Sequence, residues 1–238
     1  MRRFFHIDYR PQITWLYPIY NRLNRTNSSA LKANHKRWES TELPELSLAV
    51  ATKLVLLRTV VGRFNSDYQR LLQQIGENEE QIERNIKTGT VWTVPDEFLP
   101  FQLVADIDAF IFETRSAYEI LGKYITALFQ LLFGRRLTEQ DLKEVLRRSG
   151  LDHTWTFLLQ EERKLFFHNT APWIAVAVSE SGKYELIVLR RNARTLDEPE
   201  DYATLSQYND IFNGFMAALE RLQSHILAEI EKFERENP

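Results

Sequence analysis

The chain has 238 residues, of which 44% are hydrophobic and 26% are charged, the composition of an ordinary globular protein. The absence of cysteine excludes disulfides, iron–sulfur clusters and thiol nucleophiles. The net charge of -3 hides an asymmetry, because Lys and Arg prevail in residues 1–40 whereas Asp and Glu prevail in residues 197–238. A basic segment either binds nucleic acid or, more often, pairs with acidic surface of the same fold or of a partner.

Apolar runs in the chain are interrupted by charges, and its N-terminus does not have the pattern of a signal peptide. We therefore expect a cytoplasmic protein without a membrane partner. Residues 1–43 are predicted to be an irregular, basic and aromatic arm, followed by one helical domain over residues 44–238. We expect a first long helix over residues 46–87, weakened near Gly62 and Gly76.

A loop is predicted at residues 88–95, followed by a second long helix over residues 96–133 with a continuous apolar stripe. Gly134 ends that helix, and the next one begins with a capping box in which Thr138 is the cap and Asp141 is the acid. Gly150 should close this short helix, and Asp152 should cap the following one.

After Pro172 the periodicity changes from helical to alternating. Residues 173–178 and 184–189 are β-rich and predict a hairpin at about 173–190. A last helix is expected over residues 202–233, with apolar residues three and four apart. The predicted fold is therefore mainly α, a bundle with two long antiparallel helices, shorter helices and one inserted β-hairpin.

The most definite chemical pattern is an arginine and a histidine five residues apart, Arg163 and His168, near the end of a predicted helix. A guanidinium forks onto phosphate, and an imidazole exchanges protons near neutral pH. Each residue also has a structural alternative, because His168 could bond a helix-end carbonyl and Arg163 could form an ion pair. Residues five apart on a regular helix diverge by about 140°. The pair therefore requires either a bend before Pro172 or a cleft shared by two chains.

Other chemistries lack their motifs in this sequence. The five histidines are scattered without paired ligand spacing, so no zinc site or other metal site is expected. There is no Walker A, GxGxxG or GxSxG sequence, so neither a nucleotide cofactor nor a serine hydrolase is predicted. Acid–base and electrostatic chemistry from ordinary side chains remains.

The Arg163-x4-His168 spacing after two long helices resembles the R-x4-6-H motif of HEPN domains, which are helical modules of toxin, antiviral and RNA-processing ribonucleases. The run from Asp108 to Glu119 is similar to the acid- and Arg-bearing helix of that superfamily, and the resemblance covers about residues 45–235. It implies a metal-independent endoribonuclease that acts as a homodimer, in which Arg163 holds the phosphate and His168 is the general acid or base. A toxin or defence context would add an antitoxin or another regulatory protein as partner.

Two positions depart from the family pattern, since Lys164 replaces a common Asn and Thr170 replaces a Tyr found in some members. The polar partner of the Arg and regulation through the Tyr are therefore in doubt. A catalytically inactive HEPN-like module, used for dimerisation or protein binding, is the alternative, and an unrelated helical scaffold is a third hypothesis.

Further candidates surround the pair. Asp106 and Glu113 share one flank of the second long helix and could orient Arg163 or His168, and Lys164 and Asn169 adjoin the pair in sequence. The RNA-contact candidates are basic residues in loops, with a solvated surface as the more common alternative: Arg135, Arg136, Arg190, Arg191 and Arg194. We expect Trp155 and Trp173 in the core rather than as base-stacking platforms.

Overall fold

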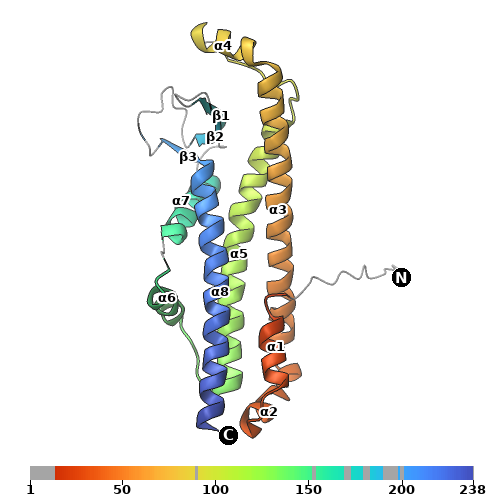
Figure 1. Ribbon diagram of the computed structural model, residues 1–238, viewed down its shortest axis with the longest axis vertical. Helices are drawn as coiled ribbons and strands as arrows, with labels where there is room; N and C mark the ends of the chain where they lie inside the picture. Colours follow the sequence, from red (N-terminus) through yellow and green to blue (C-terminus); the bar gives the residue numbers. More distant parts are fainter. Residues whose placement is uncertain are drawn as a thin grey trace, which may run out of the picture. The chain divides into compact units, whose positions relative to one another are not determined.

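The computed structural model describes residues 14–88, 91–151, 154–168, 173–178, 183–189, 198 and 201–237, and for residues 165–168 it describes the backbone alone. The fold is mainly α with a small antiparallel sheet, as expected from the sequence. In chain order the elements are α1 (Tyr17–Asn24), α2 (Ser29–His35), the 3-10 helix η1 (Trp38–Ser40), α3 (Leu43–Glu77), α4 (Glu79–Thr88), α5 (Leu99–Phe133), α6 (Glu139–Arg148), α7 (Thr154–His168), β1 (Trp173–Val178), β2 (Tyr184–Leu189), β3 (Tyr202–Thr204) and α8 (Leu205–Glu236) (Figure 1).

The chain divides into two compact units, and the long helices α3, α5 and α8 contribute residues to both. Unit 1 consists of residues 1–56, 116–151 and 217–238. Unit 2 consists of residues 57–115 and 152–216. Each unit is described separately below.

In unit 1, residues 14–43 are not the irregular arm that the sequence predicted. Leu16, Ile19 and Leu23 are buried because their spacing of three and four residues places them on one face of α1. Pro18 lies in the first turn of α1, where its missing N–H costs no hydrogen bond. The Oγ atom of Ser28 accepts a hydrogen bond from the N–H of Leu31 and caps α2. Polar clusters between these elements masked two short helices in the sequence pattern.

Aromatic side chains tie this N-terminal segment to the rest of unit 1. The indole N–H of Trp15 donates a hydrogen bond of 2.8 Å to the carbonyl of Leu219 in α8. Trp15 and Trp38 both meet the ring of Tyr124 in α5 edge to face, with centroids 6.2 and 6.4 Å apart. The segment is therefore part of the core of unit 1.

The expected capping box of α6 is confirmed, since Thr138 and Asp141 bond reciprocally to each other's backbone N–H. Gly134 and Gly150 have φ values of 65° and 72°, as expected of residues that end helices. The proposed cap at Asp152 lies outside the described residues.

In unit 2, α3 and α5 run antiparallel, because Arg63 pairs with Asp106 and, further along α3, Arg70 pairs with Asp96 before α5. The single helix expected over residues 46–87 is instead two helices that are separated at Asn78. The interruption follows Gly76, one of the two weak points noted in the sequence.

The hairpin is confirmed by the antiparallel pairing of β1 with β2, in which Trp173 faces Leu189 and Val178 faces Tyr184. The third strand was not expected, since its residues were assigned to the start of the last helix. β3 pairs with β2, and α8 begins only after Thr204, which forms a capping box with Gln207. An aromatic residue and a threonine favour a strand where a paired edge is present.

The two tryptophans differ in their environment. Trp155 on α7 is buried, as expected. Trp173 at the start of the edge strand β1 is 65% exposed, so its assignment to the core was wrong. Trp173 is the first residue of a strand that, among the described strands, pairs with β2 alone.

Candidate functional site

Helix α7 of unit 2 carries the candidate pair, and its buried face is fixed by contacts to α8. Trp155, Leu159 and Glu162 recur three and four residues apart and are all buried. The Trp155 ring meets Phe215 edge to face at 6.1 Å. The hydroxyl of Tyr208 donates a hydrogen bond of 2.7 Å to Oε2 of Glu162. These contacts determine the rotation of α7 about its own axis.

Gly214 allows α7 to approach α8 closely. A methyl group placed on Gly214 would lie 2.3 Å from Cγ of the Trp155 indole, well inside van der Waals contact. The indole therefore packs directly on the backbone of α8.

Arg163 lies next to the buried Glu162 and is exposed. Lys164 is also exposed, and its ammonium group forms an ion pair of 2.6 Å with Glu161 one turn earlier. The helix continues without interruption to His168, whose side chain lies outside the described part of the chain, as does the whole of Asn169. The structure thus places an exposed arginine side chain in the last turns of α7.

The regular helix has a direct consequence for the pair. Over five residues it turns about 140° and rises about 7.5 Å, so positions 163 and 168 lie on different faces of α7. The sequence left two arrangements open, a bend of the helix or a shared cleft, and no break in α7 separates positions 163 and 168. Any bend before Pro172 would lie in residues 169–172, outside the described residues.

Asp106, the proposed orienting acid, is engaged elsewhere. It is 2% exposed, and its Oδ1 atom accepts a hydrogen bond from the Nε–H of Arg63 on α3. Burial raises the pKa of Asp106, the Arg63 guanidinium acts in the opposite direction, and the nearby Asp67 raises it further. Its second oxygen is buried without a hydrogen-bond partner among the described residues. Asp106 therefore stabilises the contact between α3 and α5.

Glu113, the second proposed orienting residue, is half-buried on α5. It follows Phe110, whose ring meets Tyr208 edge to face at 6.3 Å, and Tyr208 in turn holds Glu162. These contacts place the part of α5 that carries Phe110 and Glu113 near α7.

The arginines considered as RNA contacts lie in different environments. In unit 1, Arg135 forms an ion pair of 3.0 Å with Glu229 and lies 5.2 Å above the ring of Phe129, which indicates a structural role. Arg136 is exposed. Arg190, Arg191 and Arg194 lie outside the described residues.

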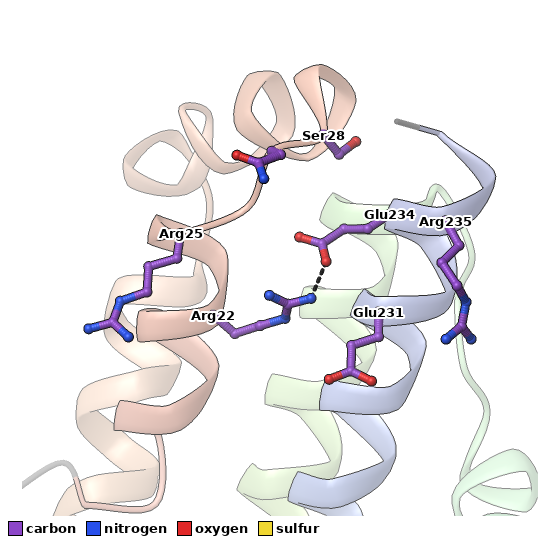
Figure 2. A pocket seen from close by; sticks show the side chains of 7 residues that line it. Arg22, Arg25, Ser28, Glu231, Glu234 and Arg235 are labelled. Atoms are coloured by element: carbon purple, nitrogen blue, oxygen red, sulfur yellow. Dashed lines mark hydrogen bonds and ion pairs between the residues drawn. The ribbon is translucent and has the colours of Figure 1, made fainter.

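A pocket in unit 1 lies between the α1 end and the C-terminal part of α8 (Figure 2). Its lining is charged and polar: Arg22, Arg25, Asn27, Ser28, Glu231, Glu234 and Arg235. Arg22 and Glu234 point toward one another and form an ion pair, whereas the guanidinium of Arg25 points away (Figure 2). Two carboxylates beside the central arginine make a poor site for phosphate. The basic N-terminal segment here pairs with the acidic C-terminal helix, which was the more common alternative.

Sequence reasoning missed Glu162 and Tyr208. The signal was present, because Glu162 continues the spacing of Trp155 and Leu159 and is an acid in an otherwise apolar stripe. Tyr208 is one of the residues spaced three and four apart in the predicted last helix, but periodicity does not identify its partner.

Within the described residues, no cluster of three His, Asp or Glu side chains is arranged to hold a metal ion. Among the helices described, none combines the length and the apolar character that a bilayer crossing requires. Comparison of the chain with family models, with curated proteins and with solved structures gives no match.

Proposed function

We propose that the chain is a metal-independent endoribonuclease of HEPN type, whose reaction depends on Arg163 and His168 of α7. The observation that carries the proposal is an exposed Arg163 on a helix that is rotationally fixed by buried contacts and continues to His168. An anchored helix limits the conformations of the charged group that must meet a phosphate. The mainly α fold with two long antiparallel helices agrees with the resemblance.

The proposed reaction is cleavage by the ribose 2′-hydroxyl. His168 accepts the 2′-OH proton while the 2′-oxygen forms a bond to phosphorus and the bond from phosphorus to the 5′-oxygen breaks. A protonated histidine returns a proton to that leaving oxygen, and the products are a 2′,3′-cyclic phosphate and a 5′-hydroxyl. Arg163 binds the phosphate oxygens and stabilises their charge. General acid–base catalysis by His168 should accelerate the reaction about 10²–10⁴-fold. Stabilisation of charge by Arg163 should add about 10²–10³-fold.

The divergence of positions 163 and 168 favours a site composed from two chains. On one helix the two residues lie on different faces, so a phosphate held by Arg163 of one chain would meet His168 of another. We therefore propose a homodimer as the active form. An antitoxin or another regulatory protein remains part of the proposal through the resemblance alone.

The experiment is cleavage of single-stranded RNA in EDTA by the wild type, Arg163→Ala and His168→Ala. We expect each substitution to lower cleavage at least about 100-fold, while Arg84→Ala, an exposed arginine on α4, leaves it unchanged. The same sequence made with 2′-deoxyribose should not be cut. Cleavage that survives both active-site substitutions contradicts the mechanism, and a folded wild type that never cuts RNA favours a binding module instead.

A further inference from the structure

Three large exposed side chains of unit 2 lie on one face of α5 or just before its start. Phe98, Phe101 and Phe112 are 66%, 73% and 49% exposed. At about 100° per residue their positions on or just before the helix fall within about 60° of one another. Ala105 lies between them on the same face and is exposed as well. We call these four residues the phenylalanine stripe.

The area of the stripe is large for an uncovered surface. A phenylalanine presents about 150–250 Å² when fully exposed, so the three rings leave roughly 350–400 Å² in water. Two such stripes facing one another would bury about 750 Å² from the rings alone, more than half of the ~1,200 Å² of a small specific interface. Flanking side chains supply the rest.

The charges around the stripe argue against RNA as its occupant. The sequence contains no Lys or Arg between Lys87 and Arg115, whereas Asp96, Glu97 and Asp108 lie in this interval. Binding of RNA, stacking on aromatic rings included, depends on basic side chains that neutralise phosphates. A negatively charged surface would repel the nucleic acid.

We infer that the phenylalanine stripe is the surface on which a second copy of this chain docks, with the two α5 helices antiparallel. A two-fold axis between residues 106 and 107 places Phe101 of each copy against Phe112 of the other. The same arrangement puts Ala105 near the axis, where small side chains let the helices approach closely. Apolar surface thus meets apolar surface on both sides, as an isologous contact requires. The choice of a second copy rests in part on the proposed function, because the composite site needs two chains.

Asp108 gives the arrangement a distinctive property. Asp108 is exposed, and none of the described residues forms an ion pair with it; partial desolvation raises its pKa. An axis at 106–107 brings the Asp108 side chains of the two copies within about one helical turn of one another. Their like charges oppose association, so removing the charge should strengthen the dimer.

The experiment measures oligomeric state by sedimentation over a concentration series, independently of RNA cleavage. We expect a wild-type dimer, an at least tenfold higher dissociation constant for Phe101→Asp, and a severalfold lower one for Asp108→Asn. Phe157→Asp, at a phenylalanine of α7 that is 62% exposed, is the control and should not change the constant. A tighter dimer of defined size in Asp108→Asn distinguishes this result from misfolding, which produces aggregates of mixed size.

Chemical cross-linking supplies a second measurement, because the chain has no cysteine of its own. Ala105→Cys treated with a short bismaleimide should form covalent dimers, whereas Ser66→Cys on the exposed surface of α3 should not. A wild type that stays monomeric, or a dimer indifferent to Phe101→Asp and Asp108→Asn, overturns the inference. So does loss of RNA binding in Phe101→Asp without a change of oligomeric state. A dimer that does not cleave RNA contradicts the proposed function and leaves the stripe assigned.

Discussion

Tyr208 of α8 donates a hydrogen bond of 2.7 Å to the carboxylate of Glu162 on α7, where Glu162 is 1% exposed. A buried carboxylate that loses a donor retains its desolvation penalty, so Tyr208→Phe should lower the free energy of unfolding by about 1–3 kcal/mol. Tyr184→Phe is the control, since its hydroxyl lies 3.4 Å from Glu79 at the surface and should contribute less than about 0.5 kcal/mol. Urea unfolding measures both, and equal effects would show that the buried bond does not hold α7.

The close packing of Trp155 on Gly214 gives a second prediction. Gly214→Ala should destabilise the protein by about 1–3 kcal/mol, because its methyl group would overlap the indole. Gly62→Ala is the matched control on α3, where nothing lies within 4 Å of the added methyl group. There the same change should stabilise the helix by up to about 1 kcal/mol. Stabilisation by both substitutions, measured as thermal midpoints, would contradict the packing of α7 on α8.

The ion pair between Arg63 and Asp106 predicts that Arg63→Ala lowers the free energy of unfolding by an amount that depends on pH. Arg63→Ala leaves Asp106 buried without its guanidinium, which should cost about 1–2 kcal/mol at pH 7 after allowance for the half-exposed arginine. Burial raises the pKa of Asp106, and removal of Arg63 raises it further. The folded state therefore binds a proton at a higher pH than the unfolded state does.

The loss of stability in Arg63→Ala, relative to the wild type, should consequently become smaller as the pH falls from 7 toward 5. Arg58→Ala, at an exposed arginine five residues earlier on α3, should show neither the loss nor the pH dependence. Denaturant unfolding at pH 7 and pH 5 measures this dependence. A loss of stability in Arg63→Ala that grows on acidification would contradict the prediction.

For His225 in unit 1 we expect a stabilising contribution that is lost as the pH falls. It stacks on Phe129 at 5.8 Å, and burial lowers its pKa, with Arg135 acting in the same direction and Glu229 against it. The unfolded chain thus binds the proton more readily, so the contribution of His225 is fully present above about pH 6.5 and is lost as the pH falls toward the lowered pKa. His225→Phe keeps the ring contact and should lose less stability between pH 7 and 5 than the wild type. An identical loss in both proteins would contradict the shift.

The elements that the sequence predicted are those whose signals are local. The stripe of α5, the capping box of Thr138 and Asp141 and the alternation of β1 and β2 all lie within one short window of the chain. The misassigned elements depend on distant partners. α1 is stabilised by the burial of Leu16 and Ile19 in unit 1, and β3 forms because β2 offers an edge.

The candidate site also combines features that local sequence signals predict with contacts that depend on distant residues. The exposure of Arg163 and the burial of Trp155 agree with the helical pattern of α7. By contrast, the engagement of Asp106 by Arg63 and of Glu162 by Tyr208 joins residues more than 40 positions apart. Which of several partners an acid meets is decided by helix packing, which periodicity alone does not specify.

Mixing the two inactive variants tests the composite Arg163 and His168 site most directly. Arg163→Ala and His168→Ala, each inactive alone, are unfolded together, refolded and assayed for RNA cleavage in EDTA. Half of the dimers should be mixed and each should contain one intact site of two, so about a quarter of the wild-type activity should return. A mixture that stays inert beside an active wild type, or variants that cleave RNA as well as the wild type does, would contradict the account.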